Sequence, residues 1–288
     1  PDAPSAPTPA PEGEAKAQAS LTYGGYTSLV YATGILGGMI ADRYLGYQRS
    51  IILGGLLMAV GCFMLLSPEI HLFLIGLAVI VAGNGLFKPN ISTMVGKLYA
   101  PGDVRRDSGF TIFYMGINAG AFVAPLITAV WIGANSGYKY GFLAAAIGMI
   151  FGIAVFQVRK GMLGHVGKSP AGREGWGPVL NVLVGAILLV PVIYFLLSQS
   201  EILGVVLLAL FAGLAVYLIW SGYSETSVQG QKYIAMFLLF TANILFWALF
   251  EQAGASLNFL AQDHVNAPFH FTLFQSANPL FIVLLAPV

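Results

Sequence analysis

The chain has 288 residues, of which 57% are hydrophobic and 9% charged, with a formal net charge of +1 at pH 7. Soluble domains carry roughly 25% charged residues, so this composition predicts a membrane protein. The small net charge argues against nucleic acid as a partner, because phosphate binding needs a concentrated basic surface. Cys62 is the single cysteine, which excludes an intrachain disulfide and a cysteine metal cluster.

Residues 1–20 are rich in proline and alanine and contain no apolar block. This composition is typical of a disordered, extended linker. A secretory signal peptide needs an apolar central region, which this stretch lacks. We therefore expect an external linker over 1–20.

The rest of the chain consists of apolar runs separated by short polar breaks. A helix needs about 20 apolar residues to cross a bilayer, and the sequence predicts nine such spans. The predicted spans are 21–41, 51–67, 72–97, 109–134, 140–158, 178–197, 202–222, 233–261 and 272–288.

Lysine and arginine are distributed unequally between alternate loops. The richer set of loops is expected in the cytoplasm by the positive-inside rule. We therefore expect cytoplasmic loops at 42–50, 98–108, 159–177 and 223–232. The poorer side holds only Lys139 and, in the leading tail, Lys16. The basic residues of the richer side are Arg43, Arg49, Lys97, Arg105, Arg106, Arg159, Lys160, Lys168, Arg173 and Lys232.

Two ionisable residues, Lys88 and Glu251, lie inside predicted spans. Charges at membrane depth cost free energy and commonly serve a substrate or ion pathway. Alternatively, Glu251 pairs with a cation to hold helices together, and Lys88 extends its ammonium to the membrane surface. Apolar surroundings favour the protonated carboxyl of Glu251. In one continuous helix, a polar face would contain Asn243, Trp247, Glu251, Gly254 and Asn258.

Other polar side chains lie at membrane depth. Tyr23 suits the interfacial aromatic belt, whereas Tyr31 lies too deep for it and lines either a cavity or the core. Asn118 binds substrate or bridges two helices. Asn278 precedes Pro279, where its amide contacts substrate or satisfies the freed backbone.

Other kinds of chemistry find little support in the sequence. The tract "GMLGHVGKS" is similar to a phosphate loop, but Met162 occupies the position of a required glycine. The four histidines have no metal-ligand spacing, and no catalytic triad can be assembled. An intramembrane enzyme is therefore disfavoured, and we expect no cofactor and no metal. A passive channel or a structural membrane subunit stays open as an alternative.

Four motifs together resemble the bacterial proton-dependent oligopeptide transporters of the major facilitator superfamily: "GGMIADRYLGYQR", "GNGLFKPNIS", "FTIFYMGINAGAF" and "FWALFEQAGASL". The similarity begins near residue 21 and implies an all-α helical bundle. It places helices two to six at 21–160, a cytoplasmic loop at 161–177, an inserted helix pair at 178–222, and helices seven and eight at 223–288. The first helix, with its E-x-x-E-R motif, and the last four helices are then missing, which implies a fragment.

The resemblance also implies roles for particular residues. The family imports di- and tripeptides with protons across the inner membrane, and carriers of other small solutes occur among its relatives. We expect a monomer. Lys88 would bind the peptide carboxylate, and Tyr31, Asn118 and Asn278 would contact the peptide backbone. Trp247 would line the pocket, and Glu251 would bind substrate and, with Lys88, couple transport to protons. Asp42 and Arg43 would form a cytoplasmic gate or, alternatively, cap helix ends.

Overall fold

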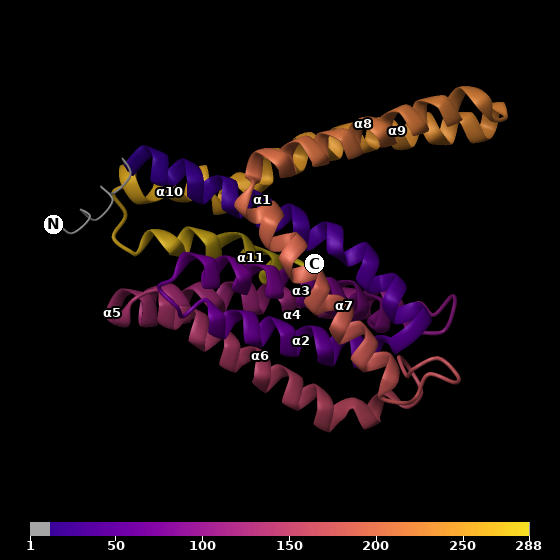
Figure 1. Ribbon diagram of the computed structural model, residues 1–288, viewed down its shortest axis with the longest axis horizontal. Helices are drawn as coiled ribbons and strands as arrows, with labels where there is room; N and C mark the ends of the chain where they lie inside the picture. The colour runs from indigo at the N-terminus through magenta and orange to yellow at the C-terminus, as the bar shows by residue number, and fades with distance from the viewer. Residues whose placement is uncertain (1–11, 288) are drawn as a thin grey trace, which may run out of the picture. The chain divides into compact units, whose positions relative to one another are not determined.

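The computed structural model describes residues 12–287, and the regular elements in this range are helices. By its contacts the chain divides into two compact units, 12–25 with 199–257 and 26–198 with 258–287, and each is described by itself. The helices are α1 (Glu12–Ile40), α2 (Tyr47–Met64), α3 (Ile70–Lys97), α4 (Arg105–Pro125), α5 (Ala134–Ser136), α6 (Lys139–Arg159), α7 (Gly177–Ser198), α8 (Ser200–Ser224), α9 (Ser227–Phe250), α10 (Ser256–His264) and α11 (Phe274–Leu285) (Figure 1).

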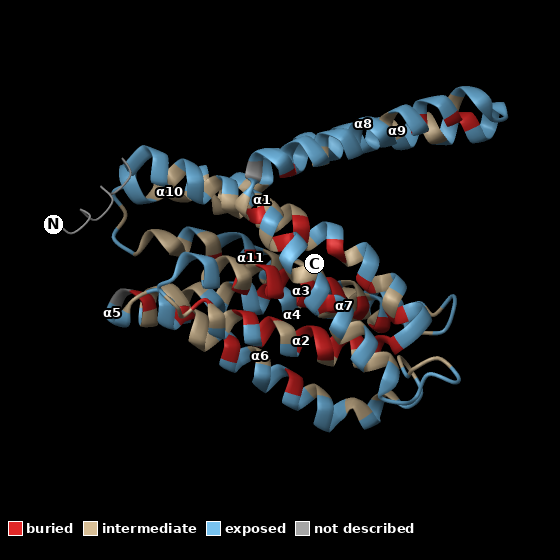
Figure 2. Cartoon of the chain, viewed as in Figure 1, coloured by how far each residue is buried: buried red, intermediate tan, exposed pale blue. Residues whose placement is uncertain are grey.

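Glycines bring α2 and α3 into close contact at the centre of the larger unit. A Cβ atom on Gly83 would lie 2.6 Å from the carbonyl oxygen of Gly54, and one on Gly61 would lie 2.7 Å from that of Gly76. Small residues allow such close approach between membrane helices, where packing replaces the hydrophobic effect as the main attraction. Buried residues accordingly concentrate on these two helices (Figure 2).

The second half of α1 packs on α3 in the same manner. A Cβ atom on Gly37 would overlap the Gly85 carbonyl group. The Thr33 hydroxyl donates to the Val81 carbonyl at 3.2 Å, and the fully buried Asn90 amide donates to the Gly37 carbonyl at 3.1 Å. Backbone contact and hydrogen bonds therefore fix α1 against α3.

The remaining helices of this unit surround that core. Helix α6 packs on α2, α7 packs on α3, and α11 packs on α4.

The chain leaves α1 through a π-helical turn, Ala41–Leu45, and Gly46 follows with a φ of 73°. A Cβ atom at Gly46 would meet the backbone of Lys168 at 2.6 Å or closer, so only glycine suits this position.

The loop between α6 and α7 is tied to the start of α2. The Arg49 guanidinium donates to the three successive carbonyls of 173–175. Gln48 donates through its backbone to Gly167 at 2.9 Å and through its side chain to Val166 at 2.7 Å. These bonds hold an irregular segment in one conformation.

The smaller unit contains a long hairpin of α8 and α9 (Figure 1). Gly222 and Gly230 lie close together, and the rings of Tyr217 and Tyr233 meet at 6.4 Å. Most apolar side chains of these two helices are exposed (Figure 2), as expected of helices that face lipid.

The all-helical prediction is confirmed, and within 12–287 seven helical spans are long and apolar enough to cross a membrane. Two of the nine expected spans do not meet this description. One is α1, which is rich in glycine, tyrosine and threonine, and the other is the short segment Phe271–Leu285. The remaining seven include Ser227–His264.

The expected linker over 1–20 is wrong for residues 12–20, which form the start of α1. Alanine, glutamate, lysine and glutamine are good helix formers and outweigh the effect of Gly13. Glu12 and Lys16 add an ion pair at 2.8 Å across one turn. The expectation for 1–11 lies outside the described residues.

Candidate functional site

Lys88 lies over an aromatic ring of α1. Its Nζ is 4.2 Å from the centre of the Tyr31 ring, within the range of a cation–π interaction. This contact holds the ammonium beside the middle of α1, which argues against extension to the membrane surface. Both side chains are exposed within the described structure.

Helix α3 passes through Lys88 and Pro89 without ending. The side chain of Asn90 donates to the Leu86 carbonyl at 2.8 Å, and Thr93 donates to the Pro89 carbonyl at 2.9 Å. These bonds support the helix around the proline, which lacks the N–H that would normally close the preceding turn. Lys88 therefore stands on a continuous helix.

Asn118 is buried in α4, and its amide donates to the Tyr114 carbonyl at 2.8 Å in the same helix. This bond lies within one helix and does not bridge two helices. Asn278 is exposed on α11. Ser276 of that helix donates to the Phe122 carbonyl at 3.0 Å, so both asparagines stand on a pair of packed helices.

Glu251 accepts a hydrogen bond from Tyr23 of α1, with 3.2 Å between the phenol and a carboxylate oxygen. Helix α9 ends at Phe250, and a 3₁₀ turn follows over Glu251–Gly254. A Cβ atom on Gly254 would overlap the Tyr23 hydroxyl, so the glycine makes room for the phenol.

The expectation of one continuous helix with a polar face over 243–258 is therefore wrong. The residue after Gly254, Ala255, has φ −120° and ψ −103°, which takes the chain out of the helical region before α10 begins. Trp247 lies one turn before Glu251 and packs edge to face against Phe246 at 5.6 Å and Phe250 at 5.4 Å. The last turns of α9 thus carry a cluster of aromatic rings directly before Glu251.

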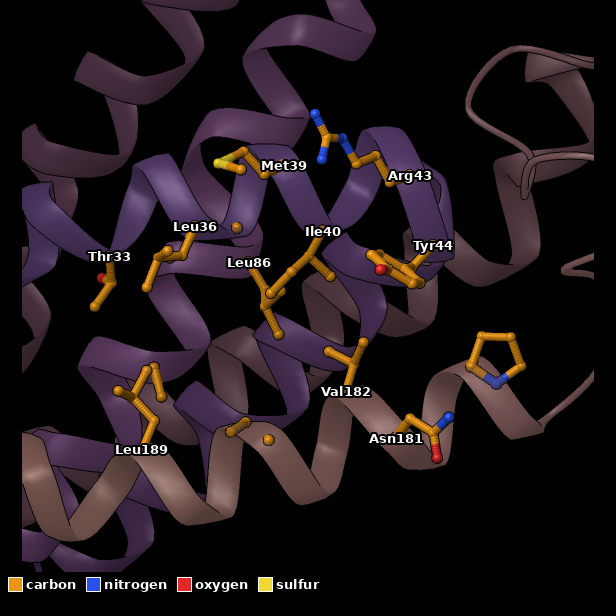
Figure 3. Close-up of a pocket in the computed structure, with 16 residues that line it drawn as sticks. Thr33, Leu36, Met39, Ile40, Arg43, Tyr44, Leu86, Asn181, Val182 and Leu189 are labelled. Carbon is orange, nitrogen blue, oxygen red and sulfur yellow. The ribbon is translucent and has the colours of Figure 1, made fainter.

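Asp42 and Arg43 lie in the π-helical turn that ends α1. Asp42 accepts a hydrogen bond from the Tyr47 hydroxyl, and neither residue provides a side-chain cap for this turn. Arg43 and Tyr44 line a mainly apolar cavity of about 570 Å³ between α1, α3 and α7, with Asn181 on the α7 side (Figure 3).

A short loop carries charged groups between α3 and α4. The Arg105 guanidinium lies 2.8 Å from Asp103 and lowers the pKa of that carboxyl group to about 2. Before α3, Glu69 caps the helix by accepting the backbone N–H groups of His71 and Leu72, at 2.9 and 2.6 Å. These bonds lower the pKa of Glu69.

The sequence-predicted residues fall into the two units. The structure brings Lys88 together with Tyr31 in the larger unit, which also holds the two asparagines, whereas Trp247 and Glu251 belong to the smaller one. Sequence reasoning missed Tyr23 as the partner of Glu251. The signal was present, because Tyr23, Thr27 and Tyr31 recur at four-residue steps along α1.

No group of three metal-ligating side chains occurs within 12–287. Protons as the coupling ion, without a cofactor, stay a prediction. The apolar helices, with ionisable and amide side chains along their length, define a multi-pass membrane protein of the transporter type.

The family model described as the POT family matches residues 48–288, so the chain belongs to the POT family. The peptide transporter YePEPT of Yersinia enterocolitica is 34% identical over 96% of this chain and 59% of its own length. A di-/tripeptide transporter of Lactococcus lactis is 36% identical over 96% of this chain and 60% of its own. The chain thus spans about three fifths of these relatives, all of which are named as transporters and not as enzymes.

Solved structures agree with this membership and with a bundle of the major facilitator type. The peptide transporter POT in complex with sulfate has a TM-score of 0.74 and 37% identity, over 93% of this chain and 57% of that one. Tetrameric PepTSo2 has a TM-score of 0.83 and 26% identity, over 94% and 62%.

Proposed function

We propose that the protein containing this chain imports di- and tripeptides together with protons by alternating access. Its relatives are named as peptide transporters, which supports the substrate class. We further propose that the loops at 42–50, 98–108, 159–177 and 223–232 face the cytoplasm, and that the protein functions as a monomer. The lysine and arginine bias supports the orientation.

One observation supports the proposal most directly: α1 supplies a tyrosine to a cation and another tyrosine to a carboxylate. Tyr31 lies under Lys88 at 4.2 Å, and Tyr23 donates to Glu251 at 3.2 Å. A short peptide carries an ammonium and a carboxylate at its two ends whatever its side chains are. A cation, a carboxylate and amide groups suit this shared backbone and place no demand on the side chains of the peptide.

Glu251 supplies the group proposed for proton coupling. A carboxylate can hold either a proton or an ion pair with a substrate ammonium, so both ligands act on the same group. A proton that enters down about 100 mV gains roughly 2.3 kcal/mol, enough to concentrate a neutral peptide about fifty-fold. Such coupling requires that both ligands favour the same conformational transition.

The test uses Glu251→Gln in the full-length protein, reconstituted in proteoliposomes with labelled dialanine. Glutamine mimics a permanently protonated side chain, so we expect loss of pH-gradient-driven accumulation with retained exchange between equal pools. Glu201→Gln, in the first turn of α8, is the matched control and should behave like wild type.

Accumulation against a gradient by Glu251→Gln would exclude this residue as the coupling group. Loss of exchange as well would indicate a structural role. Absence of peptide uptake by the wild-type protein, with uptake of another small solute, would favour the alternative of a different cargo. Dissipation of a gradient without concentrative uptake would favour a passive channel.

A further inference from the structure

A second pocket of about 570 Å³ lies at the ends of the helices of the larger unit, away from Lys88. The end of α3, the starts of α2 and α4, and the loop between α6 and α7 line it. Its lining contains four basic side chains and two tyrosines but no acidic residue: Lys97, Arg106, His165, Lys168, Tyr47 and Tyr99.

The loop side of this pocket is held in place. Gln48 binds the carbonyls of Val166 and Gly167 at 2.7 and 2.9 Å, and the Ser169 hydroxyl donates to the Leu45 carbonyl at 2.8 Å. Gly167 has a φ of 77°, and a Cβ atom there would lie 3.0 Å from the sulfur of Met94. The conformation that presents Lys168 therefore depends on glycine and on bonds from α2.

Neither Asp42 nor Asp103 lines the pocket, and each already has a partner. Asp103 pairs with Arg105, and Asp42 accepts the Tyr47 hydroxyl. Lys97 lies over the Tyr47 ring at 4.6 Å, and Lys97, Arg106 and Lys168 form no ion pair with any described residue. Three permanent cations around one cavity repel one another, and an anion between them would remove that repulsion.

We propose that this pocket binds a phosphate group, supplied either by the headgroup of an anionic phospholipid or by free phosphate. Arginine offers two parallel N–H donors to phosphate oxygens, and lysine adds compact positive charge. The lining includes Gly167 and Lys168 of the tract that is similar to a phosphate loop. Met162 excludes the nucleotide-binding form of that loop, whereas the pocket needs only its glycine and lysine.

The experiment compares the full-length protein with a triple variant, Lys97→Gln, Arg106→Gln and Lys168→Gln. A matched control removes three basic residues that do not line the pocket: Arg159→Gln, Lys160→Gln and Lys232→Gln. One arm measures retention of phosphatidylglycerol against phosphatidylcholine in nanodiscs by native mass spectrometry. The other titrates the detergent-solubilised protein with inorganic phosphate by calorimetry.

We expect each removed cation to weaken binding about fivefold in the arm that detects the ligand, with the control near wild type. A preference for phosphatidylglycerol alone identifies a lipid headgroup, and heat with inorganic phosphate identifies free phosphate. If the triple variant is not monodisperse, Lys168→Gln alone should still show the fivefold loss. No preference in either arm for the wild type, or equal losses in the pocket and control variants, would overturn the proposal.

Discussion

The two ionisable residues at membrane depth each contact a tyrosine of α1, but they stand on backbones of different kinds. Lys88 stands in the interior of α3, which continues past Pro89 and packs through glycines on α1 and α2. Glu251 begins a 3₁₀ turn directly after α9 ends. The helix with an internal proline is continuous, and the helix without one is interrupted.

This difference places the cation on a packed, continuous helix and the carboxylate at a joint, here meaning the break between α9 and α10. Helix α3 is capped at its start by Glu69 and packed along its length, so Lys88 keeps its position. The turn at Glu251–Gly254 has no side-chain cap, and its contact with Tyr23 depends on one glycine. Interrupted helices with ion-binding side chains are a recurring feature of secondary transporters.

The largest expected effect comes from removing the fixed cation. Lys88→Ala in the full-length protein should reduce dipeptide uptake by about 30-fold or more, because the peptide carboxylate would lose the ammonium proposed to bind it, and such a loss costs about 2–5 kcal/mol where the bound peptide shields the pair from water. Uptake in proteoliposomes measures it, with Lys139→Ala as control. Uptake at the wild-type rate would show that Lys88 does not bind the peptide carboxylate. Loss of monodisperse protein would indicate that Lys88 has a structural role.

A smaller effect is expected at the joint. Gly254→Ala introduces a Cβ that displaces the Tyr23 hydroxyl, and Tyr23→Phe removes it. Loss of one hydrogen bond of about 1 kcal/mol should lower pH-driven accumulation roughly fivefold relative to exchange. The matched control is Gly24→Ala, because a Cβ at that position would meet no atom within 4 Å outside the neighbouring backbone of its own helix. If Gly254→Ala and Gly24→Ala show the same ratio of pH-driven accumulation to exchange, the hydrogen bond from Tyr23 has no part in proton coupling.

The smallest effect concerns the cap that holds α3. Backbone N–H groups lower the pKa of Glu69, so its stabilising contribution is present above the ordinary glutamate pKa and is lost as the pH falls through the lowered value. Glu69→Gln should lower the melting temperature at pH 7 by roughly 1–2 °C. It should also reduce the loss of stability between pH 7 and pH 4.

Thermal unfolding of the purified protein at both pH values tests this, with Glu201→Gln as the control. An identical acid dependence in wild type and Glu69→Gln would mean that the cap contributes nothing to the stability of α3. The contrast between the continuous α3 and the interrupted segment after α9 would then depend on glycine packing alone.

Hydropathy predicted which segments are helical, because apolar runs of sufficient length have few other stable forms in a bilayer. It could not predict the interruption after Phe250, because a glycine in an apolar run permits both a helix and a turn. It also missed the start of α1 at Glu12, where alanine-rich composition is compatible with linker and helix alike.

The candidate site was predictable as residue types but not as pairs. Lys88 and Glu251 stand out because charge is rare at membrane depth. The selection of Tyr31 and Tyr23 as their partners depends on which face of α1 meets each helix, and Asn118 bonds within its own helix. Such choices arise from three-dimensional packing at single glycines, such as Gly37 against Gly85.

The bonds from α2 to the loop before α7 have a mechanical consequence. Gln48 and Arg49 form hydrogen bonds with that loop at Val166 and Gly175, and α7 begins at Gly177. The loop is therefore held almost to the first turn of α7. Without these bonds, a loop of this length would be flexible and would allow the two helices to move independently. Because α2 holds the loop up to residue 175 and α7 begins at Gly177, any movement of α2 that kept these bonds would carry the start of α7 with it.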